Sequence, residues 1–221
     1  MGERPILFSG EMVRAILEGR KTVTRRVVKP KKCRDSGVTL AACEIAGEIN
    51  QKRDFSLCPY GQPGDRLWVR EAHAFMPEPA YRRSTGIYQQ INPTDSYEAC
   101  IYRENFDRAG CFPWRPSIHM PRWASRILLE VTGVRVERLR DGEGETAFES
   151  RYLAEGLHRI HHGDGAFYYH ALKSEPGPGN WCDPFDAWRE LWCAVSGPGS
   201  WNANPWVWVV EFKVIEGVSS V

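Results

Sequence analysis

Short runs of β-branched and aromatic residues recur along this chain, and turns that contain glycine and proline separate them. The clearest run is WVWVVEFKV, which predicts a buried strand at 206–214. The same reasoning predicts further strands at 5–8, 20–28, 66–71 and 125–139. The strand at 125–139 is expected to be bent or to contain a bulge. Long helices are therefore not expected to dominate the fold.

Helical patterns are confined to three segments, at 9–19, 146–157 and 184–194. A few helices among many short strands predict an α+β fold, in which a small mixed sheet curls into a partial barrel with helices on its outside. The chain has 221 residues, and a typical domain has about 100–200. We therefore expect a single domain that covers residues 1–221.

Two stretches interrupt the strand pattern. The first, at about 30–58, is polar and is followed by a turn, and the second, at about 75–123, mixes proline, arginine and aromatic residues without a sustained period. We interpret both as excursions inserted into the domain. The sequence HRIHHGDGAFYYH at 158–170 and the glycine-rich segment after it are expected to be loops.

The overall charge is balanced, with 29 Lys and Arg against 28 Asp and Glu, or a formal net charge of +1. This excludes a uniformly basic tail that binds nucleic acid and an acidic disordered chain. No run reaches the roughly 18 apolar residues that a membrane span requires, and charges near the N-terminus argue against a signal peptide. The seven cysteines form no CxxC pair, which favours a reduced cytoplasm, the host cytoplasm for a phage-encoded protein.

A local positive charge stands out against this balance. The segment 20–34 holds eight Lys and Arg residues and no acid. Such a stripe can bind phosphate groups through ion pairs and counterion release. The alternative is a solvated strand edge that lysine and arginine protect from aggregation.

Four short motifs resemble those of a known family. The sequence GRKTVTRR at 19–26 is similar to the opening motif of ASCH domains, which belong to the PUA-like superfamily of small nucleic-acid-associated barrels. PGDRLWV at 63–69, AEG at 154–156 and the run at 206–212 resemble the family's later motifs in the same order. The resemblance is greatest to long ASCH proteins of phages and prophages, and it implies a PUA-like fold.

Some small ASCH proteins are amidohydrolases that remove the acetyl group from N4-acetylcytidine. The resemblance implies that their catalytic lysine, threonine and glutamate correspond here to Lys21, Thr24 and Glu155. Glu71, at the end of an expected strand, is the rival acid. Amide hydrolysis requires a nucleophile, a base for its proton and a donor for the leaving nitrogen.

Lys21 can act as this base only if burial or nearby positive charge lowers its pKa. Arg25 and Arg26 are candidates for supplying that charge. A regular strand would place Lys21 and Thr24 on opposite faces. The pair can therefore meet only if Lys21 lies in the turn after Gly19 and reaches across.

A nucleobase is bound by stacking on aromatic side chains and by hydrogen bonds to its edges. Most of the nine tryptophans are expected in the core, including Trp188, Trp192 and Trp208. Trp123 and Tyr60 are additional aromatic candidates for stacking. The residues assigned to substrate binding are Arg26, Trp68, Glu71, His119, Arg122 and Trp206.

Histidines at 158, 161, 162 and 170, with Asp164 and Cys182, raise the possibility of a zinc site, as do Cys33, Cys43 and Cys58. Neither group has the spacing of a zinc motif, so a polar loop is the preferred interpretation and we expect no metal or cofactor.

The sequence favours a hydrolase that acts on N4-acylated cytidine, with a modified nucleoside or single-stranded RNA as partner and no membrane. The alternatives are a non-catalytic RNA-binding module, a ribonuclease and a phage interaction protein. A polynucleotide binder would weaken steeply with ionic strength, whereas a nucleoside hydrolase would respond little.

Overall fold

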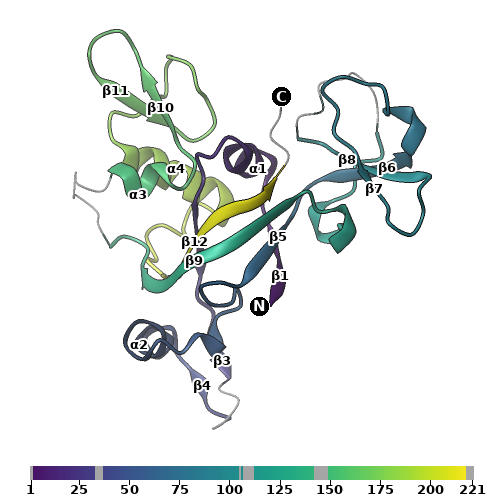
Figure 1. The fold of residues 1–221 in the computed structure, drawn as a ribbon. Coiled ribbons are helices and arrows are strands. Elements are labelled where there is room, and N and C mark those ends of the chain that lie inside the picture. The colour runs from purple at the N-terminus through teal and green to yellow at the C-terminus, as the bar shows by residue number, and fades with distance from the viewer. Residues whose placement is uncertain (1, 33–36, 105, 107–111, 142–148, 218–221) are drawn as a thin grey trace. The chain divides into compact units, whose positions relative to one another are not determined.

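The computed structural model describes residues 2–32, 37–104, 106, 112–141 and 149–217. The chain divides into two compact units. The first unit comprises Met1–Gly19, Gly64–Glu130 and Lys213–Val221, and the second comprises Arg20–Pro63 and Val131–Phe212. The chain elements of both are labelled in Figure 1.

The first unit opens with strand β1 (Glu3–Leu7) and helix α1 (Gly10–Leu17). The side chain of Ser9 accepts a hydrogen bond from the Met12 amide and caps the helix. Strand β1 pairs in parallel with β5 (Arg66–Arg70), and β5 pairs in antiparallel fashion with the first part of β9 (Ile127–Arg138). These elements confirm the strands and the helix expected in this part of the sequence.

The stretch at 75–123 forms structure that the sequence pattern did not reveal. A three-stranded sheet has the order β6 (His73–Pro77), β8 (Glu98–Tyr102) and β7 (Gln90–Ile91). The short helices η2 (Glu78–Ala80), η3 (Ser117–His119) and η4 (Arg122–Ala124) accompany it. Cys100, Tyr102, Met120 and Ala124 form its small core. The strands are short and their polar loops are long, which explains why no period is visible in the sequence.

In the second unit, β12 (Trp206–Gly217) lies between the second part of β9 and β2 (Val23–Val27). The register places Thr24 opposite Val210 and Arg25 opposite Val209. Neighbouring residues of a strand point to opposite faces. Because Thr24 and Arg25 are both buried, both faces of β2 are covered at this point.

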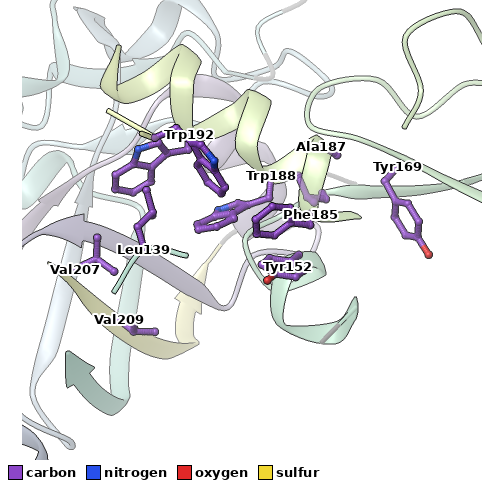
Figure 2. Packing of buried hydrophobic residues seen from close by; sticks show 11 residues of the cluster. Leu139, Tyr152, Tyr169, Phe185, Ala187, Trp188, Trp192, Val207 and Val209 are labelled. Carbon is purple, nitrogen blue, oxygen red and sulfur yellow. The ribbon is translucent and has the colours of Figure 1, made fainter. Parts of the chain in front are cut away.

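Helix α4 (Pro184–Ser196) supplies half of the buried aromatic residues in the core cluster of the second unit, namely Phe185, Trp188 and Trp192. Asp183 caps its N-terminus, and Pro184 occupies the first turn as expected for a proline at the start of a helix. Figure 2 shows the aromatic side chains of α4 and Tyr152 gathered between the helix and strand β12, which contributes Val207 and Val209. The core positions predicted for Trp188, Trp192 and Trp208 are confirmed.

Three predictions for the second unit need correction. The polar stretch at 30–58 contains helix α2 (Ala42–Lys52), as well as strands β3 (Lys31–Lys32) and β4 (Thr39–Leu40) and the short helix η1 (Phe55–Leu57). The predicted loop at 158–170 is a hairpin of β10 (His158–His161) and β11 (Phe167–His170), which extends away from α3 and α4 in Figure 1. Helix α3 (Glu149–Leu153) ends four residues before the predicted end at 157.

The predicted α+β class is confirmed, since helices and several sheets occur together. The PUA-like barrel stays a prediction. Among the described cysteines, Cys43, Cys100, Cys182 and Cys193 carry free thiols. Within the described ranges, the helices are too short or too polar to cross a bilayer.

Candidate active site

Lys21 lies just before strand β2 rather than within it. Gly19 has a positive φ of 73°, which turns the chain between helix α1 and this segment. Lys21 then forms an isolated antiparallel bridge with Glu155. The amides of Thr22 and Val23 both donate to the Ala154 carbonyl, at 2.9 and 3.0 Å. Lys21 therefore follows a turn at Glu18 and Gly19 and pairs with Glu155, and its meeting with Thr24 stays a prediction.

Glu155 lies in a tight turn that follows helix α3. Its amide donates to the Tyr152 carbonyl at 3.0 Å, and the Gly156 amide donates to the Leu153 carbonyl at 2.8 Å. Gly156 has a φ of 100°, a conformation that side-chain-bearing residues rarely adopt. The prediction that Glu155 belongs to the helix is wrong, because the helix ends at Leu153 and the chain must turn to pair with Lys21.

The side chains of Lys21 and Glu155 form a buried ion pair. Lys21 Nζ donates to Glu155 Oε2 at 2.9 Å and to the Glu155 carbonyl at 2.9 Å. The two residues are 1% and 4% exposed. The candidate base and the candidate acid are thus in direct contact in an environment that excludes bulk water.

Arg25 shares the same carboxylate. Its Nη1 donates to Glu155 Oε1 at 2.6 Å, and its Nε donates to Glu137 Oε1 at 3.1 Å. The guanidinium carbon lies 5.1 Å from the ring centroid of Trp188. Glu155 therefore holds a different cation on each carboxylate oxygen.

Burial and charge act against each other on this pair. Burial lowers the pKa of Lys21, the nearby charges of Arg26 and Arg25 lower it further, and the Glu155 carboxylate opposes the shift; the net direction is down. For Glu155, burial would raise the pKa, but Lys21 and Arg25 together bring it below its usual value. The carboxylate therefore stays ionised, while the amine is brought closer to the neutral form that accepts a proton.

Thr24 and Arg26 lie on the face of β2 that is opposite to Arg25. Thr24 is 2% exposed and lies opposite Val210, whereas the half-buried Arg26 lies opposite Trp208. Lys21 lies outside the strand, so the alternation of side chains along β2 does not decide to which face its side chain points. The basic segment at 20–34 is therefore not a uniform solvated face, since Lys21 and Arg25 are buried and Lys29, Lys31 and Lys32 are exposed.

Trp206 is the first residue of β12 and is half-buried in the second unit. Its carbonyl accepts a hydrogen bond from the Val28 amide at 2.8 Å. The Arg138 guanidinium lies 4.6 Å from the centroid of its ring. Arginine therefore occupies one face of the indole.

The other residues predicted to bind substrate belong to the first unit. Glu71 is 2% exposed and receives two hydrogen bonds from Arg126, both of 2.9 Å. Burial raises the pKa of Glu71, although Arg126 opposes the shift. Glu71 is therefore committed to a buried ion pair of its own, whereas Glu155 is the glutamate in contact with Lys21.

Trp68, His119 and Arg122 are partly or fully exposed in the first unit. The Arg70 guanidinium lies 5.4 Å from the Trp68 ring and donates to the carbonyl of Ile118, the neighbour of His119. Arg122 Nε donates to the Glu3 carboxylate at 2.8 Å. The additional aromatic candidates, Trp123 and Tyr60, are half-buried, in the first and the second unit respectively.

The histidine-rich segment makes local hydrogen bonds. The Nδ1 atom of His161 accepts from the Gly163 amide, and that of His170 accepts from the amides of Leu172 and Lys173. In the part of the chain that the structure describes, no three His, Cys, Asp or Glu side chains are grouped so as to hold a metal ion. Cys33 lies outside the described residues.

Sequence reasoning missed two residues of this cluster. Glu137 joins Arg25 to Arg151 and Arg135, and Trp188 packs against the Arg25 guanidinium. A signal for Glu137 exists in the strand, because Arg135 and Glu137 are charged residues two positions apart that alternate with buried Val136. The pairing of Glu137 with Arg25 depends on contacts between segments 112 residues apart.

Comparison with protein-family models, with curated proteins and with solved structures gives no match for this chain.

Proposed function

We propose that the protein is a hydrolase of the ASCH type, with a PUA-like fold, that removes the acyl group from N4-acylated cytidine. The observation that carries this proposal is the buried contact of 2.9 Å between Lys21 Nζ and the Glu155 carboxylate. Burial lowers the pKa of Lys21, which is the direction that favours a general base near neutral pH. The resemblance of 19–26 to the ASCH motif names the substrate class.

In this proposal Lys21 moves protons between the nucleophile and the leaving group. The Thr24 hydroxyl attacks the acyl carbon, and its proton passes to the neutral Lys21 amine. The bond between the acyl carbon and N4 then breaks, and N4 takes that proton from Lys21. Water cleaves the resulting ester by the same route, which releases the carboxylic acid and restores the Thr24 hydroxyl.

Glu155 has an orienting role in this scheme. Its lowered pKa keeps it ionised, so it is not the donor of the proton that N4 receives. Instead, its contacts with Lys21 fix the direction of the amine. Arg26, half-buried on the same face of β2 as Thr24, is assigned to binding the substrate.

The proposal is tested by incubating the protein with a panel of N4-acylated cytidines and following release of cytidine by chromatography. We expect hydrolysis of at least the acetyl compound, and loss of turnover in Thr24→Val with the fold retained. Absence of hydrolysis across the panel would overturn the proposal. If Thr24→Val keeps its activity and Lys21→Met loses it, the nucleophile would be a water molecule and not Thr24.

One observation in the first unit favours a second function, the binding of single-stranded RNA. Arg70 packs on Trp68, and the Arg115 guanidinium lies 4.8 Å from the Phe75 ring, which itself stacks on Trp123 at 5.3 Å. Arg115 is exposed and Arg70 is half-buried, and cations beside aromatic rings are typical of surfaces that bind phosphates and stack bases. This function does not require a catalytic step.

The second function is tested by measuring the affinity for a fluorescent single-stranded oligonucleotide at several salt concentrations. If the surface neutralises Z phosphates, the logarithm of the binding constant should fall with the logarithm of salt with a slope of about −0.7 Z. Trp68→Ala should weaken binding with an unchanged slope. Binding that is absent at low salt, or that is insensitive to salt, would count against it.

A further inference from the structure

We propose that Arg25 is a positioning residue, which holds the Glu155 carboxylate in the orientation that Lys21 needs and is itself fixed by Glu137 and Trp188. This inference rests on the proposed function of the Lys21 site. Nothing in the resemblance assigns a role to Arg25, which follows from the contacts alone.

The Glu155 carboxylate is held at both oxygens. Lys21 binds Oε2 at 2.9 Å, and Arg25 binds Oε1 at 2.6 Å. A carboxylate bound at one oxygen can rotate about its last bond, whereas two cations on different oxygens remove that freedom. The Lys21 amine, which donates to this carboxylate, is thereby held in one place.

Arg25 can do this because its own position is fixed at three points. Its Nη1 is bound to Glu155, its Nε is bound to Glu137, and its flat face lies 5.1 Å from the Trp188 ring centroid. A guanidinium offers several donors in a rigid plane, whereas lysine offers a single flexible charge. Lysine at position 25 would therefore keep the charge and lose the geometry.

The position of Glu137 is itself fixed by two arginines. Its second oxygen accepts hydrogen bonds from Arg135, at 3.1 Å, and from Arg151. The charged neighbours of the Lys21 amine are Glu155, Arg25 and Arg26. Ion pairs extend from Arg25 through Glu137 to Arg135 and Arg151. Positive and negative groups alternate along this network.

Loss of Arg25 should have two consequences that a purely structural role would not have. The carboxylate becomes free to rotate, and misplacement of a catalytic group by about 1 Å can cost about 10²-fold in rate. A cation next to Lys21 also disappears, so the pKa of Lys21 should rise. Activity that requires neutral Lys21 should then appear only at higher pH.

The experiment compares Arg25→Met and Arg25→Lys with the natural sequence, and uses Arg189→Met as the matched control. Arg189 lies beside Trp188 on α4 and pairs with Asp186 at 2.8 Å, outside the network. The measurements are kcat and KM for N4-acetylcytidine across pH, and the titration of the Lys21 side chain by NMR in isotope-labelled protein.

We expect kcat to fall about 10²-fold in both Arg25 variants with KM little changed. In Arg25→Met alone, the acidic limb of the profile and the Lys21 titration should move to higher pH, because Arg25→Lys retains the charge. Arg189→Met should leave kcat, KM, the acidic limb of the profile and the Lys21 titration unchanged. If Arg25→Met does not fold, Glu137→Gln replaces it, and we expect the same loss in kcat.

Two outcomes separate this inference from the proposed function. In the first outcome, the natural protein has no hydrolase activity, but the pKa of Lys21 still changes in Arg25→Met. This would contradict the function and support the positioning role. An active natural protein with unchanged kcat in Arg25→Lys, and with an unmoved Lys21 titration in Arg25→Met, would overturn the positioning role and leave the function standing.

Discussion

Lys21 and Glu155 are joined by a bridge between their backbones, by an ion pair of 2.9 Å between their side chains, and by a hydrogen bond from Lys21 Nζ to the Glu155 carbonyl. The backbone contact fixes the distance between the two chain segments, and the side-chain contact then has little freedom. Groups held on paired backbone are positioned more accurately than groups on open loops. A buried pair of this kind is costly to break, and this leads to the first prediction.

Removing one charge of the buried pair should destabilise the fold strongly. In Glu155→Gln, Lys21 and Arg25 lose the anion that they share, and breaking a buried ion pair costs about 3–5 kcal/mol. Urea unfolding measures this loss. The control is Glu48→Gln on α2, where the pair with Lys52 is exposed and should contribute little to stability. Equal effects of the two substitutions would show that the pair is not buried as described.

Gly156→Ala should destabilise the protein and disturb the site. A φ of 100° is strained for alanine, and such strain costs about 1–3 kcal/mol. Because Gly156 follows Glu155, the turn that carries the carboxylate should shift. Gly47→Ala is the matched control, since Gly47 lies in α2 with open space around it and should gain about 0.5–1 kcal/mol. Thermal unfolding of both variants tests the prediction, which fails if their effects have the same sign.

Asn50 should attach helix α2 to strand β9. Its amide donates to the Val136 carbonyl at 2.6 Å and accepts from the Val136 amide at 3.0 Å. Asn50→Ala removes two hydrogen bonds, together worth about 1–3 kcal/mol. Hydrogen exchange should show faster exchange along α2, whereas the exposed Gln51→Ala should not. Unchanged protection of α2 in Asn50→Ala would mean that apolar packing alone holds the helix.

His73 should make the first unit less stable in acid. Burial lowers the pKa of His73 below its usual value of about 6.5, and the charges of Arg115, Arg70 and His119 act in the same direction. The unfolded chain therefore binds a proton that the folded chain refuses, so stability falls as pH drops below about 6.5. Urea unfolding between pH 7.5 and 5.5 should show a smaller loss in His73→Leu. The exposed His161→Gln in the second unit should behave like the natural sequence, and an equal loss in all three proteins would contradict the assignment.

Local rules were sufficient for the elements with strong patterns. Helix α4 combines an aspartate cap, a proline in the first turn and apolar residues at helical spacing. Strand β12 is rich in β-branched and aromatic residues. In both cases the residues that form the element also bury it, so pattern and packing agree.

Other elements depend on partners that are distant in the sequence. In α2 the buried residues Ile45, Ala46 and Ile49 are embedded in a polar stretch, so the apolar stripe is too short to stand out. The hairpin of β10 and β11 has the aromatic run FYY and a turn with glycine and aspartate. These residues favour a hairpin, although the histidine-rich segment as a whole predicts a loop.

The candidate site also contains residues that could be predicted from the sequence and residues that could not. Lys21 and Glu155 could be named as candidates from the sequence, because both belong to short motif segments, although Glu155 lies in a turn and not in the predicted helix. The role of Arg25 could not, because it depends on Glu137 in β9 and Trp188 in α4 meeting one guanidinium. Such convergence is a property of the folded chain.

The rate of cytidine release from N4-acetylcytidine by Lys21→Met, relative to the natural sequence at equal concentrations of folded protein, tests the central claim most directly. Removal of a general base lowers rates by about 10²–10⁴-fold, so we predict a loss in that range. Equal rates for the two proteins would contradict the assignment of Lys21 as the proton-transferring group.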